Sequence, residues 1–128
     1  MYATVDLLEE AITEGDDVPI TWTLTSSGSP FDLSTVTKVW ITVKKDYDDD
    51  DSAALIAINS ADDPTLVTYG VAGPGDGKIY GKLIAASTVD LAQYRYVYYD
   101  IQGLNAGNIQ TFVHGRIKFH KQSTKYTS

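Results

Sequence analysis

Apolar and polar side chains alternate along several short segments of the chain, and a period of two is typical of half-buried β-strands. The clearest example is residues 19–25, PITWTLT, where Ile20, Trp22 and Leu24 share one face and threonines occupy the other. Residues 38–45, KVWITVKK, show the same pattern. Both segments are therefore predicted to be strands with one face in the core.

The longest β signal covers residues 94–120, where two strand-like runs flank a loop rich in Gly and Asn. Gly and Asn tolerate the positive φ that a tight hairpin turn requires. Alternation along the second run predicts an inward set and an outward set. The inward set is Ile109, Thr111, Val113, Gly115, Ile117 and Phe119, and the outward set is Gln110, Phe112, His114, Arg116, Lys118 and His120. The segment is predicted to be a long β-hairpin with one buried face.

The first run of this hairpin has two candidate inward sets. Either Tyr94, Tyr96 and Tyr98 face the core, or Val97, Tyr99 and Ile101 do. Residues 90–96, DLAQYRY, match the pattern around the tyrosine corner of immunoglobulin-like domains, which favours the first set. Side-chain alternation forbids both sets together unless the strand contains a bulge. Both alternatives stay open at this point.

Weaker patterns occupy the rest of the chain. Residues 2–8 form an edge strand or contribute to a helical turn, and residues 52–59 form a short strand or a turn of helix. Short strands are expected at 65–69 and 78–84. About seven short strands with turn signals between them predict one antiparallel immunoglobulin-like β-sandwich. The single domain spans 1–128, and 121–128 is a polar tail.

Composition excludes several classes of function. Acidic side chains outnumber basic ones by 17 to 10. Nucleic-acid binding depends on clustered Lys and Arg, so no nucleic-acid partner is expected. The chain has no Cys, so disulfides and thiolate metal sites are not expected. No signal-peptide pattern occurs and no apolar run approaches the ~20 residues of a membrane span, so we expect cytoplasmic synthesis and no membrane partner.

The sequence contains none of the short motifs that mark common active sites, such as Gly-x-Ser-x-Gly, the P-loop or His-Glu-x-x-His. His114 and His120 lie on one predicted face but ~20 Å apart, too far to share a metal ion. The acidic run 46–51 departs from an EF-hand, because Asp51 and Ala57 stand where that loop has Gly and Glu. Looser calcium binding by this run stays open. We expect no catalytic residue, no cofactor and no resident metal. We therefore expect that the chain is not an enzyme.

Candidate functional residues lie on the outward faces of the predicted strands. They are Trp40, Phe112, His114, Arg116 and Lys118. Aromatic residues and Arg are enriched at the centres of protein interfaces, so these side chains predict contact with other proteins or with copies of the chain in a homo-oligomer. Exposed aromatic rings also stack on sugars, so a carbohydrate-binding module that recognises a surface glycan is the alternative. Ordinary cross-strand aromatic packing would explain the same pattern without a function.

The order of several turn and strand motifs resembles the immunoglobulin-like domain of tailed-phage baseplate and tail proteins. These motifs are Gly15-Asp16-Asp17, Thr23-Leu24-Thr25, Gly28 to Ser34, Val39 to Lys45, Asp76-Gly77-Lys78-Ile79 and Tyr99-Asp100-Ile101-Gln102. The resemblance covers residues 14–120. It implies a structural or adaptor component of a phage virion, made in the host cytoplasm and partnered by other virion proteins. No receptor-binding extension follows residue 128, so a role as the receptor-binding tip is not expected.

Overall fold

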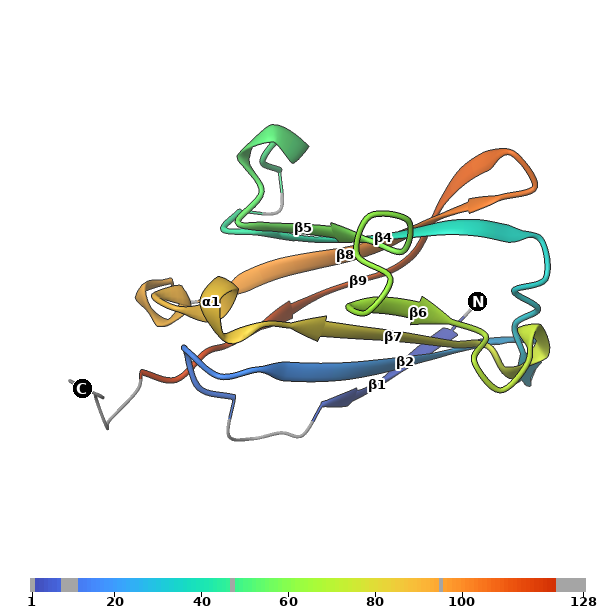
Figure 1. Cartoon of the computed structure of the whole chain (residues 1–128), viewed down its shortest axis with the longest axis horizontal. Coiled ribbons are helices and arrows are strands. Elements are labelled where there is room, and N and C mark those ends of the chain that lie inside the picture. Colours follow the sequence, from blue (N-terminus) through green and yellow to red (C-terminus); the bar gives the residue numbers. More distant parts are fainter. Residues whose placement is uncertain (1, 8–11, 47, 95, 122–128) are drawn as a thin grey trace.

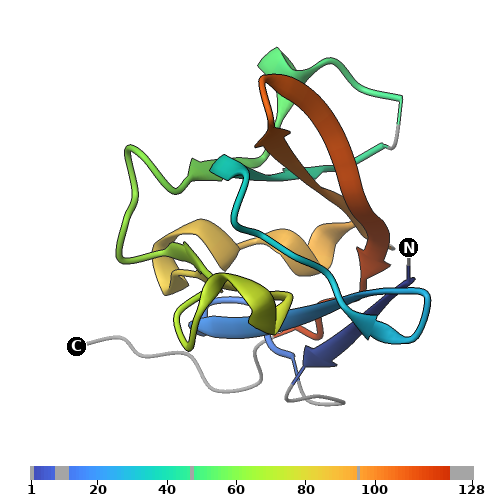
Figure 2. The same ribbon diagram turned by 90° about the vertical axis from the view of Figure 1, so that its right-hand side faces the viewer.

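The protein folds into two antiparallel sheets packed face to face, as the computed structural model shows for residues 2–7, 12–46, 48–94 and 96–121 (Figures 1 and 2). Within these residues, the first sheet contains β1 (Tyr2–Leu7), β2 (Val18–Ser26), β3 (Ser29–Pro30), β6 (Val67–Tyr69) and β7 (Lys78–Leu83). The second sheet contains β4 (Val36–Lys44), β5 (Ile56–Asn59), β8 (Val97–Asn105) and β9 (Asn108–Ile117). The short helical turns are η1 (Asp51–Ala53), η2 (Pro74–Asp76), α1 (Ala85–Thr88) and η3 (Leu91–Gln93).

The order of the strands is that of an immunoglobulin-like sandwich. In the first sheet the order is β1-β2-β7-β6, with β3 added to β2, and in the second it is β5-β4-β8-β9. Strands β1, β2, β7 and β6 thus stand where such domains have A, B, E and D, and β4, β8 and β9 stand where they have C, F and G. Strand β5 adds one strand beside β4. The predicted antiparallel immunoglobulin-like β-sandwich is confirmed.

The segment that follows β1 contacts the second sheet as well. Thr13 forms a parallel bridge with His120, just beyond the end of β9. The Glu14 N–H donates to the His120 carbonyl at 2.9 Å, and the His120 N–H donates to the Ile12 carbonyl at 2.9 Å. The N-terminal part of the chain therefore ties the two sheets together at this end of the sandwich.

The core lies between the two sheets and follows the predicted alternation in β2 and β4. Ile20, Trp22 and Leu24 of β2 are buried, and so are the inward residues of β4, which are Val39, Ile41 and Val43. The Trp22 ring lies 5.6 Å from the Tyr99 ring of β8, measured between centroids. In antibody domains the corresponding strands carry the disulfide that joins the sheets. Here an aromatic pair occupies that place in a chain without Cys.

The two alternatives for the first run of the hairpin are resolved by β8. Its inward residues are Val97, Tyr99, Ile101 and Gly103, all buried. Tyr98 faces outward, and Tyr94 packs partly buried against the core from the turn that precedes the strand. The alternative that sends Tyr94, Tyr96 and Tyr98 inward as one strand face is therefore wrong.

A β-bulge in β9 changes the predicted facing of its first half. Ile101 pairs with Val113 but Gln102 pairs with Thr111, so Phe112 is an extra residue in the strand. Phe112 and Val113 are both buried, at 8% exposure each. The prediction that Phe112 faces outward is wrong, and so is the prediction that Ile109 and Thr111 face inward, because both are exposed. On one side of a bulge, the inward-facing and outward-facing positions of the strand are exchanged. Alternation in the sequence assumes a regular strand and therefore cannot predict this exchange.

The other predicted segments agree in part with the structure. The predicted strands at 65–69 and 78–84 are confirmed as β6 and β7, and residues 2–7 form β1. Residues 52–59 contain both open alternatives, since η1 ends at Ala53 and β5 begins at Ile56. The polar tail from residue 122 onward and most of the helical alternative after β1 lie outside the described residues.

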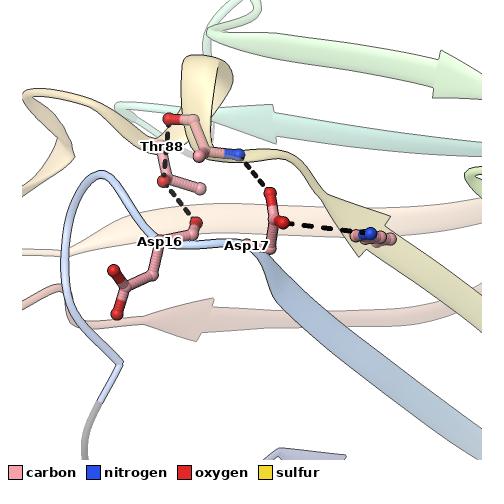
Figure 3. A network of polar contacts seen from close by, with 5 residues as sticks. Asp16, Asp17 and Thr88 are labelled. Atoms are coloured by element: carbon pink, nitrogen blue, oxygen red, sulfur yellow. Dashed lines mark hydrogen bonds and ion pairs between the residues drawn. The ribbon is translucent and has the colours of Figure 1, made fainter.

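A buried polar contact joins the turn before β2 to α1 (Figure 3). The Thr88 hydroxyl is fully buried and donates to the Asp16 carbonyl at 2.7 Å. The Asp17 carboxylate accepts from the Ala85 N–H at 2.7 Å and lies 3.9 Å from Lys82 Nζ. Because α1 has no side-chain cap of its own, Asp17 supplies an acceptor at the start of that helix.

Replacing Thr88 by valine is expected to lower the free energy of unfolding by about 0.5–1.5 kcal/mol, because the hydrogen bond from the buried Thr88 hydroxyl to the Asp16 carbonyl is lost at nearly constant side-chain volume. Thr88→Ser keeps the hydroxyl and serves as the matched control. Urea denaturation followed by circular dichroism measures both variants. A valine variant as stable as the serine variant would show that the hydrogen bond contributes nothing.

Candidate functional site

The outward side chains of the second sheet form four rows across its strands, because directly paired residues of antiparallel strands point to the same side. We call this set of side chains the outer face. The rows are Lys38–Leu104–Ile109, Asn59–Trp40–Gln102–Thr111, Ala57–Thr42–Asp100–His114 and Lys44–Tyr98–Arg116. Strands β4 and β8 are each paired on both sides, and this pairing holds their outward side chains in place.

Trp40 lies near the middle of the outer face and is half-buried. The Lys38 Nζ lies 5.1 Å from the centroid of its ring, within the range of a cation–π interaction. Beside the ring is a shallow hollow of about 290 Å³, which is lined by Trp40, Thr42, Ala57, Gln102 and Ile109. Ile109 is 68% exposed, so this part of the outer face presents apolar surface to solvent.

The other end of the outer face is built from tyrosine and arginine. The Arg116 guanidinium lies over the Tyr96 ring, with 4.2 Å between its central carbon and the ring centroid. A hollow of about 190 Å³ is lined by Tyr98, His114, Gly115 and Arg116. A second hollow of about 330 Å³ adjoins it and is lined by Lys45, Asp46, Gln93, Tyr94, Tyr96 and Tyr98. Tyr98 lines both hollows.

The outer face differs in charge from the chain as a whole. Its charged residues are Lys38, Lys44, Arg116 and Asp100, so basic groups predominate even though the chain has a net charge of −7. Acidic residues gather instead in the loop between β4 and β5, which contains Asp46 and Asp48 to Asp50. A partner that presents acidic groups would suit the outer face better than a basic one.

The structure brings three of the predicted site residues together. Trp40, His114 and Arg116 share the outer face, and Lys118 is exposed just past the end of β9. Phe112 is instead a core residue, with its ring 5.6 Å from that of Phe31. Sequence reasoning missed Ile109, because the bulge hid its true facing.

Two features of the described residues bear on metal binding and on titration. No group of three or more His, Asp or Glu side chains within them is arranged to hold a metal ion. The acid with a clearly shifted pKa is Asp32, whose pKa is lowered chiefly by the hydrogen bond that its carboxylate accepts from the Ser34 N–H at 2.9 Å. Asp32 is exposed in the connection that precedes β4 and is not part of the outer face. In this part of the chain, no helix is long and apolar enough for a membrane crossing.

The strand order defines the class of the protein as an immunoglobulin-like β-sandwich. Comparison with models of known protein families found no match, and no characterised protein sequence matches the chain. Function must therefore be inferred from the outer face and from the motifs in residues 14–120.

Proposed function

We propose that this chain is a non-enzymatic structural or adaptor component of a phage virion, in its tail or baseplate, and that it binds other virion proteins or copies of itself. The observation that carries the proposal is the outer face, where Trp40, Tyr98 and Arg116 stand exposed or half-buried on one sheet. These residue types dominate the energetics of protein interfaces. An immunoglobulin-like sandwich is also the fold that the motif resemblance implies.

The outer face is already ordered, which favours binding. Trp40 sits between two paired neighbours, Asn59 and Gln102, and the Lys38 side chain covers part of its ring. Arg116 is held over Tyr96 in the same way. Side chains that are fixed before association lose less conformational entropy when a partner arrives. A partner of complementary shape can therefore gain affinity from these few residues.

A carbohydrate-binding module is the second candidate function. The hollow beside Trp40 places an aromatic ring next to the hydrogen-bonding side chains of Thr42 and Gln102, a combination that suits a sugar ring. However, the Lys38 ammonium group lies over the Trp40 ring, so a stacking sugar would have to displace it. This arrangement favours protein assembly over sugar binding.

We expect Trp40→Ala to reduce incorporation of the chain into virions by at least about tenfold, since truncating an interface hot spot costs about 2 kcal/mol or more. Particles assembled in cells that express a tagged variant would be purified by density gradient and their content of the tagged chain measured. Val71→Ala is the matched control, because Val71 is 69% exposed in the β6–β7 connection, away from the outer face. Its incorporation should equal that of the wild type.

Equal incorporation of the Trp40→Ala and Val71→Ala variants would contradict the role of the outer face in assembly. A glycan-binding screen on the same proteins separates the second candidate. Binding of a soluble glycan that Trp40→Ala abolishes, together with absence of the wild-type chain from particles, would favour the carbohydrate-binding module.

A further inference from the structure

The β8–β9 hairpin ends in a segment that is exposed on both of its faces. Asn108, Ile109, Gln110 and Thr111 are all exposed, although they follow one another along a paired strand. The turn itself, Ala106-Gly107, has positive φ at both residues, as a two-residue hairpin turn of type I′ requires. The tip is fastened to the sandwich where the Ala106 N–H donates to the Thr35 carbonyl at 3.0 Å.

Strand β9 is also the longest outer strand of the described sandwich. It pairs with β8 on one side, and along Asn108–Ile117 no described strand pairs with its other side. The outer strands β5 and β6 have four and three residues, whereas β9 has ten. Short strands and charged side chains normally protect a sheet edge. The first six residues of β9, NIQTFV, carry no charge.

The register of the hairpin shows which backbone groups face this free edge. Asn105 pairs with Asn108 across the two-residue turn, and Gly103 pairs with Gln110. In an antiparallel pair, hydrogen-bonded and non-hydrogen-bonded residues alternate, so Asn108 and Gln110 direct their backbone groups toward β8. The N–H and C=O groups of Ile109 and Thr111 therefore point away from β8. The bulge at Phe112 ends this regular stretch.

We propose that a second copy of this chain pairs with the free edge of β9, antiparallel, around a two-fold axis at Gln110. Ile109 and Thr111 of each copy exchange backbone hydrogen bonds with Thr111 and Ile109 of the second copy. The two four-stranded sheets then join into one continuous sheet. The inference rests on the proposed assembly function and specifies one of its partners and contacts.

The charge of the edge favours a second copy as its occupant. Residues that face one another in this pairing belong to the uncharged segment 108–112, so no like charges oppose each other. The contact is isologous, as closed dimers require. It also covers Ile109, whose side chain is 68% exposed and would lie diagonally opposite Ile109 of the second copy. Because a single strand pairing buries little area, the dimer should dissociate on dilution.

The test is sedimentation equilibrium of the full chain over a wide concentration range, with two variants that act on the edge. Ile109→Lys places two like charges at the pairing, and Thr111→Pro removes an N–H that β8 does not use, a substitution that edge strands tolerate. Val89→Lys adds the same charge at a residue that is 54% exposed outside the sheets, and it is the control. We expect the wild type and Val89→Lys to dimerise equally and both edge variants to stay monomeric.

Amide hydrogen exchange read by NMR locates the contact. The Ile109 and Thr111 amides should exchange more slowly as the dimer forms, while exchange at the Val71 amide should not change. A wild type that stays monomeric at every concentration, or a dimer that survives Ile109→Lys, would overturn the inference. Slow exchange of these amides only inside particles would assign the edge to a different virion protein and would likewise overturn it.

The outcomes for the pairing and for the proposed function can be distinguished. A chain that is monomeric in solution and still enters virions refutes the β9 pairing and leaves the proposed function standing. A chain that dimerises through β9 and never enters virions keeps the pairing and refutes the proposed function.

Discussion

Replacing Trp22 by alanine is expected to lower the free energy of unfolding by about 3–5 kcal/mol, the usual cost of truncating a large buried aromatic side chain. Trp22 is 1% exposed and its ring contacts that of Tyr99 across the sandwich, so the change opens a cavity between the sheets. With no disulfide in the chain, no covalent link limits the separation of the sheets at this point. Urea denaturation followed by circular dichroism measures the loss.

Trp22→Phe is the matched control for this prediction. Phenylalanine fills part of the space and removes the indole N–H, which is buried and has no hydrogen-bond partner among the described residues. An unpaired buried donor is itself destabilising, so its removal offsets part of the lost packing. The phenylalanine variant should therefore lose much less stability than the alanine variant. Equal losses would show that aromatic packing at this position contributes little.

Replacing Gly103 by alanine is expected to lower the free energy of unfolding by about 1–3 kcal/mol through overpacking. A Cβ atom at Gly103 would overlap Cε2 and Cζ of Phe112, so the buried Phe112 ring must move. Gly75→Ala is the control, because a Cβ there meets no atom within 4 Å. Thermal and urea denaturation of both variants measure the difference.

The Gly103 variant also tests the bulge in β9. The bulge sends Phe112 into the core, whereas uninterrupted alternation would leave it on the outer face. If Phe112 pointed outward, a methyl group at residue 103 would not meet the Phe112 ring. A Gly103→Ala variant as stable as the Gly75→Ala variant would therefore contradict the inward position of Phe112.

Alternation alone was sufficient to predict the strands whose two faces differ in polarity. In β2, threonines separate Ile20, Trp22 and Leu24, so only the face with these three apolar residues could be expected in the core. In β8 both faces carry tyrosine, and the facing depended on the packing of Tyr99 against Trp22. That contact joins strands of different sheets, so a local pattern could not predict it. The turn α1 also depends on a contact between residues far apart in the sequence, because the Asp17 carboxylate accepts from the Ala85 N–H.

The candidate site was predictable on one side of the bulge in β9. His114 and Arg116 lie after Phe112 in the strand, where the inward residues Val113 and Ile117 keep the predicted facing. Ile109 lies before Phe112, where the extra residue reverses the facing. No residue type in this part of β9 marks the bulge, because Phe112 is as compatible with a regular strand as with a bulged one. The exposed position of Ile109 on the outer face was therefore not predictable.

We propose that the chain functions as an assembled component of a phage virion, and its presence in purified particles tests this proposal. The most direct measurement is its copy number per particle, determined by quantitative mass spectrometry of virions purified through successive density gradients. We expect a fixed copy number that further purification does not change, in a fixed ratio to the other tail and baseplate proteins. A chain that remains in the unassembled fraction, or whose amount falls with each purification step, would contradict the claim.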